Sequence, residues 1–173
     1  MDRRQRRQQA ARLYKAHAAR LLAYVRAMCA GNGHVPEDVV HEVFLNLMRK
    51  DVEVEPDRAL PYLFSCVRNR LLNLRRADRR RRRHEAKRAE TLSPQVFDPE
   101  PGREQAARQL ETALARLPRE QREAVVMRIW GGMTLAETAL VQQVPLKTAA
   151  SRYEYGVRKL RRWMEPADEQ TDA

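Results

Sequence analysis

The sequence predicts an all-α protein of two small helical domains joined by a flexible linker. Apolar residues recur every three or four positions in each periodic segment, and no stretch of four to eight residues alternates convincingly as a strand would. The stretch 89–103 is rich in proline and acidic residues, a composition typical of a linker. Because 43% of the 173 residues are hydrophobic, each side of the linker can bury a small core. We therefore expect domains at 12–88 and 104–163.

Three helices are expected in the first domain. The first carries an apolar face and ends at the glycine-containing stretch 31–33. The second begins at Pro36, which is acceptable in a first turn, and carries an apolar stripe through 39–48. The third opens near Pro61, and its apolar residues stop before the arginines of 79–83. We expect that final, polar stretch to project into solvent.

Four helices are expected in the second domain. The first covers about 106–117, and Pro118 opens the next, which ends at the two glycines 131–132. Thr134 and Glu137 have the spacing of a capping box, which starts a short helix.

A tight connection, 142–145, leads from that short helix to the last helix, 146–163. Two helices joined in this way predict a helix-turn-helix.

The last helix has two distinct faces at 100° per residue. One face is apolar and is expected in the core: Leu146, Ala149, Tyr153, Val157 and Leu160. The other carries hydroxyls and cations: Thr148, Ser151, Tyr155, Arg158, Lys159 and Arg162, with Lys147 and Arg152 on its flanks. Such a face could be an ordinary solvated surface, but the capped short helix before it favours a recognition helix that contacts bases and phosphates.

Charge indicates a nucleic-acid partner. The net charge is +11 and the pI about 10.4, which favours a polyanion. The third helix concentrates amides and cations: Arg68, Asn69, Arg70, Asn73, Arg75 and Arg76. Charge alone could mean a solubilising segment, but its place on one continuous helix favours a second DNA contact.

Other classes of function find little support. Cys29 and Cys66 lack the paired spacing of a zinc site, and we expect no metal and no cofactor. Catalytic motifs of common enzyme classes are missing, and His34 and His41 have no third ligand nearby, so we do not expect an enzyme. No apolar run approaches the roughly 20 residues of a membrane span, and the arginine-rich start lacks a signal core. We expect a cytoplasmic protein without membrane insertion.

Three segments resemble bacterial sigma factors. The polymerase-binding helix of their conserved region 2 is similar to residues 37–50, EDVVHEVFLNLMRK. The promoter-melting segment that follows it resembles residues 61–85, PYLFSCVRNRLLNLRRADRRRRRHE. Region 4 looks like residues 114–162, LARLPREQREAVVMRIWGGMTLAETALVQQVPLKTAASRYEYGVRKLRR. Their order around a short linker is similar to the extracytoplasmic-function group.

The resemblance implies partners and site residues. Core RNA polymerase would dock on Asp38, His41, Glu42, Phe44 and Met48. Flipped bases of the minus-ten element would meet the loop 51–60 and the helix carrying Arg68, Asn69, Asn73, Arg75 and Arg76. Duplex DNA of the minus-thirty-five element would meet Lys147, Thr148, Ser151, Arg152 and Tyr155, with Arg158 one turn beyond. Such sigma factors are generally held inactive by an anti-sigma partner.

Four positions depart from the family's pattern. His41 stands where glutamine is usual, which could add a pH response. Gln143 replaces the usual turn glycine, Ala150 stands where a basic residue is common, and Glu154 places a carboxylate near expected phosphates, where Arg158 could offset it. The competing interpretations are a stand-alone helix-turn-helix regulator, which would not need the docking surface on the second helix, and an RNA-binding protein, whose stacked-aromatic sheet motifs this chain lacks.

Overall fold

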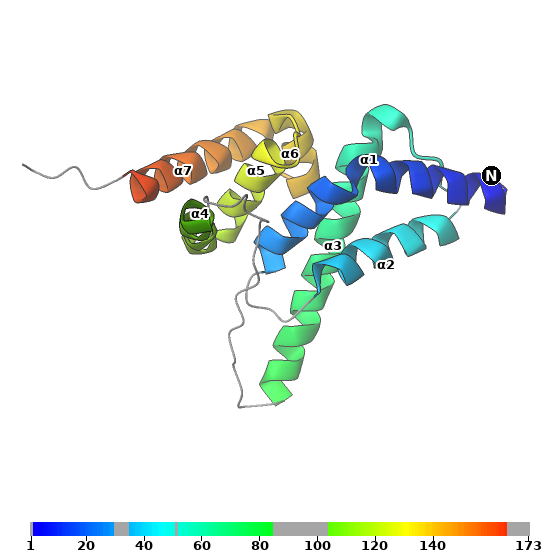
Figure 1. Cartoon of the computed structure of the whole chain (residues 1–173), viewed down its shortest axis with the longest axis horizontal. Coiled ribbons are helices and arrows are strands. Elements are labelled where there is room, and N and C mark those ends of the chain that lie inside the picture. The colour runs from blue at the N-terminus through cyan, green and yellow to red at the C-terminus, as the bar shows by residue number, and fades with distance from the viewer. Residues whose placement is uncertain (1, 30–34, 51, 85–103, 166–173) are drawn as a thin grey trace, which may run out of the picture.

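The computed structural model describes residues 2–29, 35–50, 52–84 and 104–165, and every regular element in these ranges is a helix, as predicted. The expected linker, 89–103, lies outside the described residues. Seven helices are described (Figure 1): α1 Arg3–Cys29, α2 Pro36–Arg49, α3 Pro56–His84, α4 Glu104–Arg116, α5 Arg119–Ile129, α6 Leu135–Gln142 and α7 Leu146–Met164.

Two helices of the first half begin earlier than expected, whereas α2 begins at Pro36, as predicted. α1 starts at Arg3, ahead of the expected boundary at 12, and its first turns pack beside α2. α3 starts at Pro56 rather than near Pro61, which lies inside the helix. Pro56 suits a first position because the N–H that proline lacks would have no partner within the helix there. The second half of α3 projects away from the other helices (Figure 1), and Arg79, a residue of that half, is exposed as predicted.

Aromatic and aliphatic side chains from α1, α2 and α3 build the core of the first half. Tyr24 and Phe64 are completely buried, and their rings meet edge to face with 5.2 Å between centroids. Arg26 of α1 and Glu37 of α2 form an ion pair at 2.9 Å. The hydrogen bond from Arg26 lowers the pKa of Glu37, so the carboxylate stays charged at neutral pH.

A close helix crossing organises the second half. Gly156 of α7 is buried against α5, and a Cβ at this position would lie 2.7 Å from Val125 Cγ2 and 3.3 Å from the carbonyl oxygen of Gln121. The missing side chain lets the two backbones approach. Of the five residues expected on the core face of α7, Ala149 and Leu160 are buried. The prediction was wrong for Leu146, which is 54% exposed. Leu146 lies in the first turn, ahead of the crossing.

The two halves pack directly on each other. α5 lies against α1, and α6 lies against α3 (Figure 1). Buried residues of both halves form one continuous apolar cluster, in which Met28 and Leu63 join Val126 and Met133. The described helices therefore form a single closed body.

Both cysteines are free thiols with weak acidity. Cys29 is buried, and desolvation raises its pKa to about 11. Cys66 is half-buried, and burial raises its pKa as well. In the described parts of the chain no three His, Cys, Asp or Glu side chains are grouped as metal ligands, and no helix has the length and apolar character of a membrane span.

The crossing of α5 and α7 predicts the outcome of a double-mutant cycle. Gly156→Ala places a methyl group against Val125, and overpacking of this kind costs about 1 to 3 kcal/mol of unfolding free energy. Val125→Ala removes the clashing methyl groups, so the double variant should lose less stability than the two single losses combined. Urea denaturation of the four proteins measures this. Simple additivity would contradict the close crossing.

Candidate nucleic-acid and partner interfaces

The helix-turn-helix predicted from the capping pattern is present. Thr134 Oγ1 accepts a hydrogen bond from the N–H of Glu137 at 3.1 Å, and the Glu137 carboxylate accepts one from the N–H of Thr134 at 2.6 Å. α6 ends at Gln142, and Gln143 adopts a left-handed conformation with φ of 58°. The N–H of Val144 then donates to the carbonyl of Ala139 at 3.1 Å, which closes the turn before α7.

Most of the predicted recognition residues on α7 face outward. Lys147, Tyr155 and Arg158 are exposed, and Thr148 and Ser151 are half-buried. The Ser151 hydroxyl donates to the carbonyl of Lys147 at 2.6 Å, and the Arg158 guanidinium lies 5.3 Å from the centre of the Tyr155 ring. α7 thus presents hydroxyls near its N-terminus and a cation stacked on an aromatic ring farther along.

Arg152 points inward instead. Its Nη1 donates to Gln142 Oε1 at 2.9 Å, and the Gln142 amide donates to Glu123 Oε2 at 3.2 Å. This arginine is therefore held by the protein in the closed arrangement.

The predicted DNA-binding residues of α3 divide between two environments. Asn69, Asn73 and Arg76 are exposed. The two asparagines line a cavity of about 310 Å³ between α2 and α3, which also carries the amide of Asn46 and the phenol of Tyr62. Amides and an aromatic ring around one cavity can hydrogen-bond and stack on an unpaired base.

The other two cations of this set, Arg68 and Arg75, face the protein. Arg68 is 15% exposed, and its Nε donates to Glu123 Oε1 at 3.1 Å. Arg75 donates to the carbonyl oxygen of Met28, and burial, followed by the nearby charge of Arg119, lowers its pKa. Neither arginine is open to a phosphate in this arrangement.

The predicted docking residues of α2 form an acidic and apolar surface. Asp38 and His41 are exposed, and Met48 is half-buried. Glu42 is half-buried and pairs with Arg70 of α3 at 2.6 Å. Phe44 is only 5% exposed, so it supports the surface from below.

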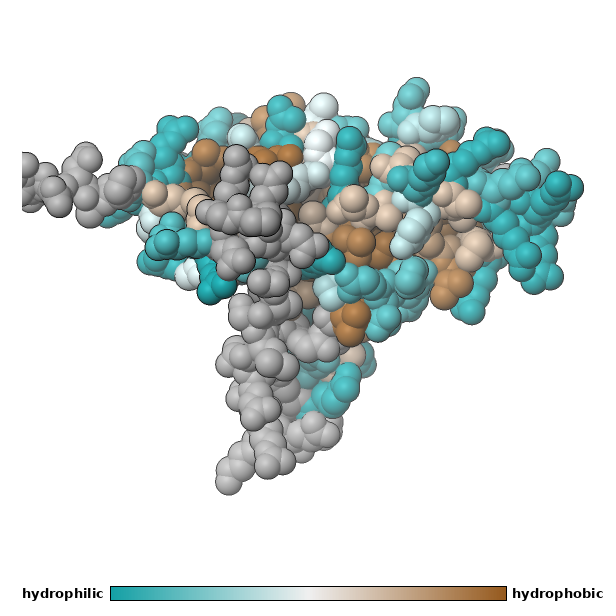
Figure 2. Space-filling model, viewed as in Figure 1, coloured by the Kyte–Doolittle hydropathy of each residue, from teal (hydrophilic) through white to brown (hydrophobic). Residues whose placement is uncertain are grey.

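Tyr14 of α1 completes this surface and was missed by the sequence analysis. Its ring stacks on His41 with 5.9 Å between centroids and meets Phe44 edge to face at 5.1 Å. Together with Leu45 and Met48 these rings line an apolar groove of about 360 Å³ between α1 and α2. Figure 2 shows hydrophilic side chains covering the end of the molecule where α1 begins. Tyr14 lies beside the apolar stripe of α1, so periodicity alone did not select it.

A buried carboxylate lies where the halves meet, and it too was missed. Glu123 of α5 is 1% exposed. Its Oε1 accepts hydrogen bonds from the hydroxyl of Tyr24 at 2.7 Å and from Arg68. Burial and then the charge of Glu123 raise the pKa of Tyr24 well above its ordinary value, so the phenol remains a donor. In the sequence, Glu123 resembles any solvated glutamate on a helix.

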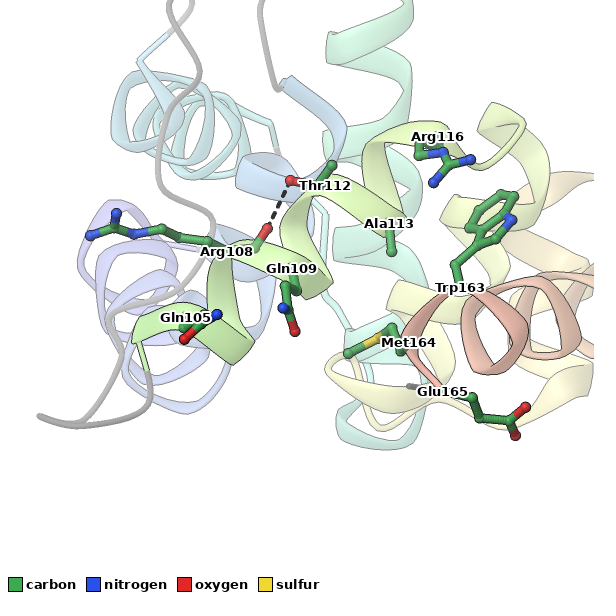
Figure 3. A pocket seen from close by; sticks show the side chains of 9 residues that line it. All are labelled: Gln105, Arg108, Gln109, Thr112, Ala113, Arg116, Trp163, Met164 and Glu165. Atoms are coloured by element: carbon green, nitrogen blue, oxygen red, sulfur yellow. Dashed lines mark hydrogen bonds between the residues drawn. The ribbon is translucent and has the colours of Figure 1, made fainter. Parts of the chain in front are cut away.

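A wide cavity of about 980 Å³ lies between α4 and the end of α7 (Figure 3). Arg116 stacks over the Trp163 ring at 4.6 Å from its centre, and Met164 adds an apolar side chain. None of the predicted site residues lines this cavity.

Family comparisons match both halves of the chain. Residues 13–81 match the model described as sigma-70 region 2, and residues 107–160 match the model described as sigma-70, region 4. Among similar proteins, the RNA polymerase sigma factor CarQ of Myxococcus xanthus is 29% identical over 86% of this chain and 85% of its own. The ECF RNA polymerase sigma factor EcfG of Rhodopseudomonas palustris (strain TIE-1) is 28% identical over 76% and 72%.

Solved structures share the fold. The sigma factor RpoE of Bartonella quintana, crystallised with the anti-sigma factor NepR, has a TM-score of 0.72 and 16% identity, covering 93% of this chain and 97% of that one. CnrH, solved in complex with the cytosolic domain of CnrY, has a TM-score of 0.63 and 20% identity, covering 90% and 87%.

The left-handed Gln143 predicts a stabilising substitution. A residue with a side chain loses about 1 kcal/mol in this conformation, and glycine does not. Gln143→Gly should therefore raise the melting temperature by about 1 to 2 °C, after subtraction of the greater entropy of glycine in the unfolded chain. Gln143→Ala is the matched control because alanine keeps the strain. Equal melting temperatures for the two variants would contradict this explanation of the turn.

Proposed function

Because the chain belongs to the sigma-70 family and is an extracytoplasmic-function RNA polymerase sigma factor, we propose that α2 docks it on core RNA polymerase while α3 and α7 contact two elements of a promoter. One observation carries this proposal: the chain has both a helix-turn-helix, α6 and α7, and a second polar helix, α3. The amides of α3 line a cavity against α2, and α2 borders the apolar groove of the docking surface. A stand-alone regulator would need only the first of these. We also propose the domain limits 12–88 and 104–163, with α1 extended to Arg3.

α7 is the element proposed to read duplex DNA. Lys147, Thr148 and Ser151 occupy its first turns, where the N–H groups and the positive end of the helix dipole favour phosphate. Tyr155 and Arg158 lie farther along, with the Arg158 guanidinium over the Tyr155 ring. The minus-thirty-five element is the proposed target of this face.

α3 is the element proposed to hold the melted minus-ten strand. Asn69 and Asn73 line the cavity between α2 and α3, whose size suits a single base. Arg76 is exposed on the same helix one turn beyond Asn73, and Arg79 and Arg80 follow it toward the projecting end. The cations would then follow the phosphates while the amides contact a base.

α2 is the element proposed to dock on polymerase. Asp38 offers an exposed charge, and His41 and Met48 border the apolar groove with Tyr14.

We propose further that the chain is not an enzyme and that it acts in the cytoplasm, where polymerase and promoter DNA are found. Both solved neighbours were determined in complex with a second protein, and one of these proteins is named an anti-sigma factor. We propose that this chain binds an anti-sigma factor too.

Charge reversal at Asp38 tests docking. Asp38→Arg should lower co-purification with core RNA polymerase at least tenfold, because it reverses an exposed charge at the docking surface and breaks no ion pair among the residues that the structure describes. Glu42→Arg is a poorer probe because it also breaks the pair with Arg70. Glu120→Arg, exposed on α5, is the matched control. Undiminished association of Asp38→Arg would remove α2 as the docking element. Salt-sensitive DNA binding by a wild-type chain that never associates with polymerase would favour the stand-alone regulator.

Removal of one cation tests the recognition helix. In the reconstituted holoenzyme, Lys147→Ala should weaken binding to promoter duplex several-fold and lower the salt dependence of that affinity by about one phosphate contact. Arg161→Ala removes an exposed cation from the other end of the same helix and should change neither quantity appreciably. Binding isotherms over a range of salt concentrations distinguish the variants, and equal losses for both would mean that α7 contributes only general charge.

A further inference from the structure

We infer that an arginine cluster at the start of α1 and the end of α2 binds phosphate groups of the melted promoter strand, downstream of the minus-ten base. The inference rests on the proposed function, in which the cavity between α2 and α3 holds an unpaired base of that strand. It adds a site for the phosphates beyond that base, on helices other than the arginine-rich end of α3.

The cluster consists of four arginines that line one cavity of about 350 Å³ together with two apolar side chains: Arg3, Arg6, Arg7 and Arg49, beside Leu45 and Met48. Three of the arginines are exposed, and Arg6 is half-buried. Hydrophilic side chains cover this end of the molecule, where α1 begins (Figure 2). Most of the cluster is therefore accessible to a ligand from solvent.

The described residues that line this cavity include no carboxylate to balance the cations. In the cavity between α2 and α3, by contrast, Arg70 is paired with Glu42 at 2.6 Å. The carboxylate of Asp2 is used at the start of α1, where it accepts a hydrogen bond from the N–H of Arg4 at 3.3 Å. Glu53, which follows α2, borders a different cavity of α1. The arginine cluster thus lacks a counter-charge of its own.

This arrangement of the arginines is unfavourable without an anion. Like charges that converge on one cavity repel each other. Arg3 and Arg6 also lie at the positive end of the α1 dipole, where the first turn contains no acidic residue. Arg6 Nε is buried and has no hydrogen-bond partner among the described residues. Phosphate oxygens would supply both the missing negative charge and strong acceptors for the guanidinium groups.

The end of α2 connects the arginine cluster to the base cavity. Lys50, the residue after α2, lines the cavity between α2 and α3, and Arg49 beside it in the chain lines the arginine cavity. A helix is about 10 Å across with its side chains. Even at the duplex rise of about 3.4 Å per nucleotide, three or four nucleotides cover that width. A strand with a base between α2 and α3 can therefore pass over the end of α2 and reach the cluster.

The order of the cations along the base cavity assigns the cluster to the downstream side. α2 and α3 run in opposite directions, because Glu42 pairs with Arg70, whereas Lys50, two turns farther along α2, lies near Cys66, which comes earlier on α3. The arginines beyond Asn73 on α3 and the cluster at the end of α2 therefore lie toward opposite ends of the cavity. α3 leads in the chain to the second half, whose proposed target lies upstream. The cluster is then left for the downstream phosphates.

Nucleic acid fits the cluster better than the polymerase segment that is proposed to dock on α2. Asp38 and Glu42 make that docking surface acidic, so a partner that complements it offers cations. The arginine cluster requires a partner of the opposite charge. A DNA strand carries one negative charge at every nucleotide, and its backbone bends easily when it is single-stranded.

Fork-shaped promoter DNA bound to the reconstituted holoenzyme tests the inference. One fork ends at the minus-ten element, and the other continues downstream with a short unpaired extension of the melted strand. Arg3→Ala/Arg49→Ala should bind the extended fork roughly fivefold more weakly than the wild-type chain, with a salt slope lower by about 1.4 for two phosphate contacts at about 0.7 each. Its affinity for the short fork should not change, because that DNA does not reach the cluster.

Lys15→Ala/Arg161→Ala is the matched control, because it removes two exposed cations that lie outside the cluster. This control should bind both forks as the wild-type chain does. Arg3→Lys/Arg49→Lys keeps both charges and should retain most of the affinity for the extended fork. Arg7 stays unchanged in all variants because it also borders the apolar groove of the docking surface.

Equal losses on the two forks, or an equal loss in the control, would overturn the inference, because the cluster would then contribute only general charge. Weaker co-purification of Arg3→Ala/Arg49→Ala with core polymerase would also overturn it and would assign the cluster to an acidic protein surface. The proposed function is tested separately by the wild-type holoenzyme. If it binds the short fork but gains nothing from the extension, the inference fails and the proposed function stands; if it binds neither fork, the proposed function fails.

Discussion

A buried carboxylate needs hydrogen-bond donors from the protein because it has lost those of water. Glu123 is such a carboxylate, and it lies where helices of both halves meet. Tyr24, Arg68 and Gln142 come from α1, α3 and α6, and all three must be in place for the carboxylate to be satisfied. The relative position of the halves follows from this demand. The apolar residues around it form one continuous cluster, but their contacts are less selective about geometry because dispersion and burial are nondirectional.

Local patterns predicted much of the fold. The capping box at Thr134, the helix-turn-helix and the helical character of all described elements agree with the sequence analysis. These features depend on residues a few positions apart, so the sequence contains them directly. The early start of α3 was missed because Pro61 was read as a first-turn residue, whereas Pro56 takes that place. Leu146 is exposed because it lies in the first turn of α7, ahead of the crossing with α5. Periodicity assigns Leu146 to the apolar face of the helix, but it does not indicate where along the helix that face is covered.

The candidate site was predictable in part for the same reason. Periodicity separated the polar face of α7 from its buried face. The concentration of amides and cations on α3 singled out Asn69 and Asn73, and both are exposed. It could not indicate that Arg68 and Arg75 turn inward, because an arginine on the border of a helix face can serve either solvent or an acceptor across an interface. Glu123 and Tyr14 acquire their significance only from partners far along the chain, on α1, α2 and α3.

The acidity of the two thiols bears on how the protein meets oxidants. Peroxide reacts with thiolates, and burial keeps Cys29 and Cys66 protonated at neutral pH, with Cys29 at a pKa of about 11. Cys29 is also 2% exposed, so an oxidant has little access to its sulfur. Disulfide exchange and sulfenic acid formation are correspondingly slow at this position. Burial thus protects the Cys29 thiol from oxidation in two ways, by keeping it protonated and by limiting access to its sulfur.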